Sequence, residues 1–318
     1  MGNKITIGIG ARNEECATIC STLRSIRVAV KFVIGKEFNI VVCLNGNYDK
    51  ALLEVNKYKE EYGDIKVHII YNSEEGIIST QRKIIESYPA DIYVFLDGDT
   101  IVKKDALYFL LSEFDRDNKV WVAYGRTKPL GVRSKSFFER INVLYNNQKF
   151  LTKRYYFHGR LFAIRDWYFP DKTNYRKNNN LLNRFGYFLS LDDVYLSFYT
   201  LDKYGPDSIK EVKESICYAW PISNFKDWYK TYRRTKIELI KVSLLYPEYR
   251  YLLKRTKRKT QWDKLLQADS DEIILWSFFL VLRFIYNIIF DMELLFISLK
   301  IYKPTIQWET VWSTKKEI

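Results

Sequence analysis

Two aspartates directly follow an apolar run at residues 92–96: they are Asp97 and Asp99, with Gly98 between them. Neighbouring carboxylates repel each other unless a cation lies close to both. A divalent cation such as Mg²⁺ or Mn²⁺ binds a few carboxylates and completes its coordination shell with phosphate oxygens and water. The pair therefore predicts a site for a phosphate-bound metal ion. The alternative is an ordinary strand-to-loop turn, because Asp-Gly is common in turns.

The segments before this pair alternate between two hydrophobic patterns. Apolar or β-branched runs predict strands, and apolar residues at helical spacing predict helices. Alternation of this kind predicts an α/β fold with a mostly parallel sheet and helices on both faces. The predicted strands are residues 4–9, 38–44, 66–71 and 92–96, and the predicted helices are residues 14–30, 50–62 and 77–87.

Polar residues follow three of these predicted strands. Ligands of such sheets bind at the carboxyl ends of the strands. We therefore expect three clusters to share one site: Arg12, Asn13 and Glu14 after the first strand, Asn45 and Asn47 after the second, and Asp97 to Asp99 after the fourth.

The composition narrows the class of protein. Of the 318 residues, 47% are hydrophobic and 28% charged, which excludes a disordered or fibrous chain. Lys and Arg exceed Asp and Glu by 51 to 38, a net charge of +13. This excess favours partners that carry phosphate, and a basic surface without such a role is the alternative. The four cysteines lack zinc-site spacing and are too few for a disulfide framework in a chain of this length, which fits a reducing compartment.

Five motifs in this chain resemble, in order and spacing, those of the family 2 inverting glycosyltransferases, which have the GT-A fold. The likeness covers about residues 4–236. It implies a GT-A domain at residues 1–236, with a Rossmann-like, mostly parallel sheet flanked by helices. The composition of residues 237–318 predicts a separate helical, membrane-associated region. The motifs are Asn13-Glu14-Glu15, the turn at residues 44–49, Asp97-Gly98-Asp99, residues 159–165 and Asp192-Asp193.

The resemblance implies a metal-dependent transfer of a sugar from a nucleotide-diphosphate donor, with a UDP-sugar favoured, to a hydroxyl of a glycan or lipid-linked acceptor. Such transfers build cell-surface glycans or lipid-linked oligosaccharides. The family places aspartate where this chain has Asn45, which leaves the nucleobase open, although an asparagine amide can still bond a uracil edge. The residues implied for donor binding are Ala11, Arg12, Asn13, Glu14, Asn45, Asn47, Arg82, Asp97, Gly98, Arg233 and Arg234.

The resemblance also assigns the acidic pair Asp192-Asp193 to catalysis. An inverting transfer needs a base that deprotonates the acceptor hydroxyl, and Asp193 stands at the position that the family uses. Asp192 would support Asp193 or contact the acceptor. The alternative is that one of the two only caps a helix. Arg233 and Arg234 would bind the diphosphate, or lie on a solvated helix face.

His158 and Gly159 are candidates for binding the acceptor. His158 is also a candidate third metal ligand beside Asp97 and Asp99. A structural role is the alternative, and it is the commoner one for a lone histidine.

Residues 273–290 are almost wholly apolar and follow a basic run at residues 254–259. This length is close to the minimum for a membrane span, but Arg283 in the middle is costly there. Three interpretations stay open: a buried helix, a helix lying in the membrane interface and a true span. We expect a cytoplasmic protein that contacts the cytoplasmic face of a membrane peripherally, where basic residues attract anionic lipids.

Two other functions compete with sugar transfer. A sugar-phosphate nucleotidyltransferase would share the fold, and residues 8–12 partly match its glycine-rich first loop, but the usual Pro-Lys does not follow. The acidic pair would also have no obvious use there. A nucleic-acid-binding protein would explain the charge and the aromatic residues, but no recognition motif supports it. We therefore expect no nucleic-acid partner.

Overall fold

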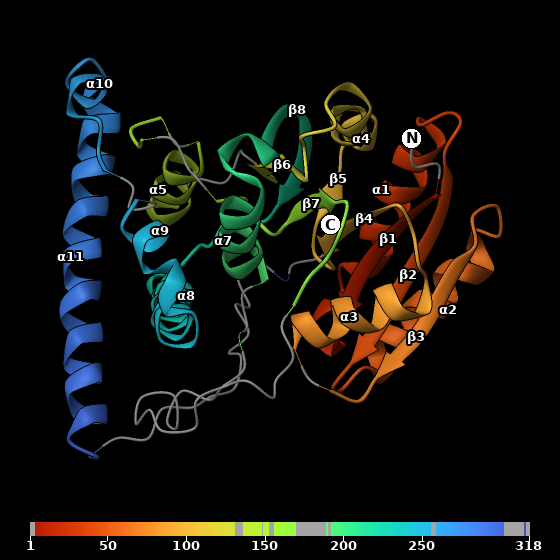
Figure 1. Ribbon diagram of the computed structural model, residues 1–318. Helices are drawn as coiled ribbons and strands as arrows, with labels where there is room; N and C mark the ends of the chain where they lie inside the picture. The colour runs from red at the N-terminus through yellow and green to blue at the C-terminus, as the bar shows by residue number, and fades with distance from the viewer. Residues whose placement is uncertain are drawn as a thin grey trace.

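The computed structural model describes residues 4–74, 76–130, 136–147, 149–152, 156–169, 189, 192–255, 259–301 and 315. Figure 1 shows a central sheet with helices around it and one long helix, α11, at the edge of the molecule. The sheet has eight strands in the order β3-β2-β1-β4-β7-β6-β8-β5. The strands are β1 (Lys4–Ala11), β2 (Glu37–Asn45), β3 (Val67–Asn72), β4 (Ile92–Asp97), β5 (Ile101–Val102), β6 (Val122–Pro129), β7 (Leu161–Ile164) and β8 (Ile209–Ala219). The α-helices are α1 (Ile19–Lys31), α2 (Asp49–Glu61), α3 (Ile77–Ser87), α4 (Ala106–Arg116), α5 (Phe137–Asn146), α7 (Asp192–Tyr204), α8 (Phe225–Leu245), α9 (Arg250–Arg255), α10 (Trp262–Leu266) and α11 (Ser270–Ser298), and short 3-10 helices are η1 (Asn13–Glu15), η3 (Pro206–Ser208) and η4 (Pro247–Tyr249).

The first four strands are parallel neighbours, as the sequence predicts. β1 lies between β2 and β4, and β3 pairs with the outer side of β2. The next strand in the sheet, β7, runs antiparallel to β4, so the sheet is mixed. Ala11 pairs with Leu44, and Gly10 pairs with Asp97. The carboxyl ends of β1, β2 and β4 therefore meet at one edge of the sheet.

Helices bury both faces of this sheet. Successive side chains of a strand point to opposite faces. On one face, Ile5, Ile7 and Ile9 pack with residues of α1, α2 and α4. On the other face, Val41 and Phe95 pack with residues of α3 and α7. This arrangement confirms the predicted α/β class, and it explains why the parallel strands are apolar throughout.

The first predicted helix, residues 14–30, differs from the structure. The chain there forms the short 3-10 helix η1 and then α1, which begins only at Ile19. Contacts to other loops hold the first turn away from helical geometry. The backbone N–H of Asn13 donates to the Asn47 carbonyl at 2.8 Å, and the Thr18 hydroxyl donates to the Gly98 carbonyl at 2.9 Å.

The long helix α11 packs on α5 and α8 through one face. Trp276, Phe279 and Tyr286 are buried against these helices. α11 spans 29 residues with a mean hydropathy of 2.1 in its most apolar stretch, so its length and composition are those of a possible membrane span, although a third of that stretch is buried in the protein. The predicted domain boundary at residues 236 and 237 falls inside the continuous helix α8.

Candidate active site

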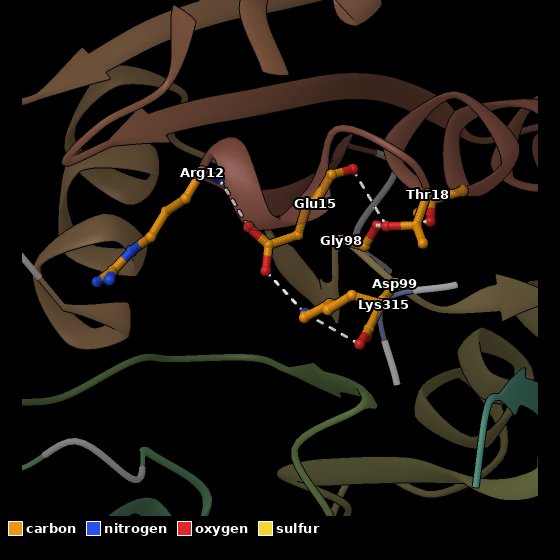
Figure 2. Close-up of polar contacts among 7 residues, drawn as sticks. Arg12, Glu15, Thr18, Gly98, Asp99 and Lys315 are labelled. Atoms are coloured by element: carbon orange, nitrogen blue, oxygen red, sulfur yellow. Dashed lines mark hydrogen bonds and ion pairs between the residues drawn. The ribbon is translucent and has the colours of Figure 1, made fainter. Parts of the chain in front are cut away.

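Residues before and within α1 hold the turn at residues 97–99 in place (Figure 2). The carbonyl oxygen of Gly98 accepts hydrogen bonds from the hydroxyls of Thr18 and Thr22, at 2.9 and 3.0 Å. A Cβ atom at Gly98 would lie 2.9 Å from Cγ of Glu15. Close packing thus requires glycine between the two aspartates, and the hydroxyls fix the turn that carries them.

Asp97 and Asp99 differ in how readily they ionise. Burial, and then the negative charge of Asp99, raise the pKa of Asp97 to about 6. Burial also opposes the ionisation of Asp99, but the positive charges of Lys315 and Arg160 outweigh it and hold the pKa of Asp99 below its usual value. Asp99 is therefore a carboxylate at neutral pH, and a further cation nearby would favour the same state in Asp97.

Asp99 has one oxygen that suits a metal ion. Its Oδ2 lies 3.0 Å from the ammonium nitrogen of Lys315, whereas Oδ1 is buried and has no hydrogen-bond partner among the described residues. A buried acceptor without a partner is costly, and a divalent cation would satisfy it. In the described part of the chain, no three His, Cys, Asp or Glu side chains gather around one metal position. Substrate oxygens and water would therefore complete the coordination shell.

The asparagines at the ends of β1 and β2 build the loops around this turn. Asn13 Nδ2 donates to Asn47 Oδ1 at 2.7 Å, and Asn13 Oδ1 accepts from the backbone N–H of Lys50 at 2.8 Å. Asn45 is 2% exposed, and its Nδ2 donates to the carbonyl of Glu74. The other end of that amide, Oδ1, is buried and has no hydrogen-bond partner within the described ranges.

The acidic pair opens α7 and lies close to Asp97. The backbone N–H of Gly159 donates to Asp193 Oδ2 at 3.1 Å, and Gln81 Nε2 donates to Asp192 Oδ2. Asp97, Gly159, Gln81 and Asp192 line a cavity of about 10 Å³, room for about one water molecule. The structure therefore brings together residues from α3, β4, α7 and the segment before β7, as the motifs predict for Asp97, Gly159 and the acidic pair.

The pKa of Asp192 lies well above the usual value for an aspartate. Burial, and then the charge of Asp193, raise the pKa of Asp192 to about 7. Trp167 Nε1 donates to Gln81 Oε1 at 3.0 Å, which turns the amide NH₂ group of Gln81 toward Asp192. Asp192 therefore exchanges its proton near neutral pH.

A family model for glycosyl transferase family 2 matches residues 6–187, more than half of the chain. The chain belongs to glycosyl transferase family 2. This assignment favours sugar transfer over the nucleotidyltransferase and the nucleic-acid-binding alternatives. A sequence comparison with curated proteins found no match.

Two solved structures of glycosyltransferases are similar to this family 2 enzyme. The mannosyltransferase PcManGT from Pyrobaculum calidifontis, in complex with GDP-Man and Mn²⁺, has a TM-score of 0.53 and 16% identity, over 94% of this chain and 86% of that one. Glucosyl-3-phosphoglycerate synthase from Mycobacterium tuberculosis, in complex with Mn²⁺, UDP and glucosyl-3-phosphoglycerate, has a TM-score of 0.48 and 16% identity, over 76% and 80% of the two chains. The likeness to PcManGT agrees with the expected GT-A fold.

The two arginines predicted to bind the donor have different surroundings in this family 2 enzyme. Burial lowers the pKa of Arg234 to about 10, while Asp97 and Asp193 favour its charged form. Arg233 forms an ion pair with Glu293 of α11, with distances of 2.9 and 2.8 Å from its Nε to the two carboxylate oxygens. Consecutive helical residues point about 100° apart, so α8 directs only Arg234 toward the aspartates. This geometry favours Arg234 over Arg233 as the arginine that faces the aspartates, and donor binding by either residue stays a prediction.

The remaining residues predicted to bind the donor, the acceptor or the metal make no contact within the described residues that assigns them such a role. His158 Nδ1 accepts a hydrogen bond from the backbone N–H of Arg160 at 3.3 Å, and nothing in the described ranges gathers metal ligands around it. Arg82 is half-buried on α3, and Ala11 is buried at the end of β1. The side chain of Glu14 lies outside the described residues.

Several residues of the site are absent from the sequence-based prediction. Arg160 and Glu15 stand inside motifs that the sequence analysis recognises, so a signal for them exists. Gln81 and Lys315 have none, because their partners are far away in the chain. Lys315 contacts Glu15 across 300 residues (Figure 2).

Proposed function

We propose that this family 2 enzyme is a metal-dependent inverting glycosyltransferase that moves a sugar from a nucleoside diphosphate, with UDP favoured, to a hydroxyl acceptor. One observation carries the proposal: Asp99 Oδ1 is buried without a hydrogen-bond partner among the described residues, beside Asp97, at the carboxyl end of β4. Parallel sheets bind their ligands at this edge.

Asp99, with Asp97, would hold the metal, either Mn²⁺ or Mg²⁺. The bound ion would act as a Lewis acid on the diphosphate leaving group. Arg234 and Arg160 add positive charge at Asp97, which suits a multiply charged anion. The Mn²⁺ in the PcManGT complex, a protein of the same fold, is in accord with this assignment.

Asp193 would be the base that removes the proton of the acceptor hydroxyl. Its Oδ2 accepts a hydrogen bond from the Gly159 backbone, which orients the carboxylate. Asp192, held by Gln81, would position Asp193. Gly159 and His158 would then lie next to the acceptor.

Asn45 would select the nucleobase. One N–H of its Nδ2 donates to the Glu74 carbonyl, and its buried Oδ1 has no hydrogen-bond partner among the described residues. That oxygen needs an N–H donor. Uracil and guanine offer a ring N–H, whereas cytosine and adenine can donate only through an exocyclic amino group. We favour a ring N–H as the partner of Asn45 Oδ1, and hence a uridine or guanosine diphosphate sugar, with UDP preferred.

A thermal-shift panel tests this function. The wild-type protein is heated with UDP, GDP, CDP or ADP, each with and without Mn²⁺. A ligand that binds only the folded state raises the melting temperature by mass action. We expect a Mn²⁺-dependent rise with UDP or GDP, and no Mn²⁺ dependence in Asp99→Ala. A wild-type protein that responds to none of the four nucleotides would contradict the proposal.

The outer face of α11 is apolar, and for this reason we propose a lipid-linked acceptor. Large apolar side chains there are exposed along the helix, and on a soluble protein such a continuous face marks an interaction surface. We propose that it dips into the cytoplasmic leaflet of a membrane as an interfacial helix, with the enzyme in the cytoplasm. The exposed residues are Ile274, Phe278, Val281, Phe284, Ile285, Ile288, Ile289, Met292, Leu295 and Phe296.

Flotation with liposomes tests this contact. We expect the wild type to float with anionic vesicles at low salt, and less well as salt screens the basic residues. The double variant Val281→Glu/Phe284→Glu should stay at the bottom, whereas Leu53→Glu, which alters a similarly exposed apolar residue on α2, should float normally. A wild type that stays unbound would indicate a soluble acceptor, and a dimer in solution would indicate that a second copy covers α11.

A further inference from the structure

A lysine from the C-terminal segment lies at the proposed metal site. The ammonium nitrogen of Lys315 is 3.0 Å from Asp99 Oδ2 and 2.7 Å from Glu15 Oε1 (Figure 2). Exposed fractions of the side chains are 15% for Lys315, 14% for Glu15 and 5% for Asp99. Ion pairs on the surface contribute little to stability. This one is largely shielded from solvent, so we treat Lys315 as part of the site.

The contacts of Lys315 leave a position for the metal. The lysine takes one oxygen of Asp99, and the other oxygen, Oδ1, keeps no hydrogen-bond partner in the described part of the chain. Glu15 is fixed independently, because its Oε2 accepts from the backbone N–H of Arg12 at 2.8 Å. An ammonium that only replaced the metal would bridge Asp97 and Asp99. The second partner of Lys315 is Glu15 instead, so both cations can be held together.

The ammonium also has capacity for one more acceptor. A lysine ammonium carries three N–H donors, and within the described residues Glu15 and Asp99 account for two of them. Negative charge develops on the leaving diphosphate beside the metal during transfer. A preorganised donor that is aimed at developing charge stabilises the transition state. The position of Lys315 against the metal ligand suits this role.

We propose that Lys315 is a diphosphate-binding residue, whose ammonium is held by Glu15 and Asp99 and donates a hydrogen bond to the nucleoside diphosphate beside the metal ion. This inference rests on the proposed metal-dependent transfer. It makes Lys315 part of the donor site. Glu15 then acts as a positioning residue, because it holds the lysine and does not itself touch the donor.

The test measures binding by calorimetry and compares the wild type with Lys315→Ala, Lys315→Arg and Lys316→Ala. The last variant removes the same charge one residue along the chain. UDP, GDP, uridine and guanosine are each titrated at saturating Mn²⁺, and Mn²⁺ is also titrated alone. We expect Lys315→Ala to bind the preferred nucleoside diphosphate about 10-fold or more weakly, the usual worth of a hydrogen bond to a charged group. Nucleoside binding should not change.

Lys315→Arg should recover most of the affinity, and Lys316→Ala should match the wild type. Equal affinity of Lys315→Ala and wild type for the diphosphate overturns the proposal. Tighter binding of Mn²⁺ and diphosphate by Lys315→Ala would also overturn it, because the lysine would then compete with the metal. An equal loss of nucleoside affinity would mean a merely structural role. A wild type that binds neither UDP nor GDP with Mn²⁺ would refute the proposed function as well.

Discussion

Replacing Asp193 by asparagine removes the charge of this side chain and preserves its shape. The asparagine carbonyl can still accept the hydrogen bond that the Gly159 N–H donates at 3.1 Å. The lost charge also supports Arg234, but that arginine keeps Asp97 and Glu238 as neighbours. We therefore expect Asp193→Asn to fold, with a loss of unfolding free energy of about 1 kcal/mol.

The effect on turnover should be much larger than the effect on stability. A general base contributes about 10²–10⁴-fold to the rate, which corresponds to about 3–5 kcal/mol in the activation barrier. The kcat of Asp193→Asn should fall by this factor, while the affinity for UDP stays unchanged, because binding of the diphosphate does not use the base. The assay is the release of UDP from a UDP-sugar in the presence of Mn²⁺, with UDP calorimetry in parallel.

Asp192→Asn is the matched control for this experiment. Asp192 is buried and held by Gln81, so its variant should lose only about 10-fold, through the altered position of its neighbour. If Asp193→Asn keeps most of the wild-type kcat and Asp192→Asn is inactive, Asp192 is the base. If both variants keep most of the wild-type kcat, neither carboxylate acts as the base and the proposed mechanism is wrong.

Three further predictions follow from the geometry. Gly98→Ala places a Cβ atom 2.9 Å from Cγ of Glu15, so thermal unfolding should show a loss of about 1–3 kcal/mol, and unchanged stability would contradict the packing argument. Arg234→Ala should weaken UDP binding, whereas Arg233→Ala should lower the melting temperature and leave UDP affinity unchanged; calorimetry showing the reverse pattern would refute their assignment. Because burial raises the folded-state pKa of Asp192 from 3.8 to about 7, its contribution to stability is complete below about pH 4 and is lost as the pH rises through 7. In urea titrations between about pH 4 and 7, the unfolding free energy of Asp192→Asn minus that of the wild type should therefore increase with pH. A difference that is constant with pH would contradict the raised pKa of Asp192.

The parallel half of the fold is predictable because its signals are local. Residues 77–87 carry a helical pattern that ends before Pro89, and α3 has these bounds in the structure. The apolar run before Asp97 has the composition of a buried parallel strand. Once the strands are recognised as parallel, topology alone places Arg12, Asn45 and Asp97 at one edge of the sheet.

The contacts that complete the site depend on information that no local pattern carries. Gln81 reaches Asp192, which is 111 residues away. The choice between Arg233 and Arg234 depends on the rotation of α8 about its axis. That rotation follows from packing against α11. From the sequence alone, α11 could be a buried, an interfacial or a membrane-spanning helix, so its packing could not be predicted. The Asn13 to Glu15 segment has a helical pattern, but contacts from Asn47 and Gly98 impose a different backbone.

The ion pair between Glu15 and Lys315 can form only late in synthesis, because the two residues are 300 positions apart in the chain. At about 5–20 residues per second, Glu15 emerges roughly 15–60 s before its partner is made. The parallel strands and the turn at residues 97–99 can form during this interval, since they need only the earlier part of the chain. The carboxylates of Glu15 and Asp99 lack this cation until then. The donor side of the sheet can therefore fold before the cation that neutralises these two carboxylates has been synthesised.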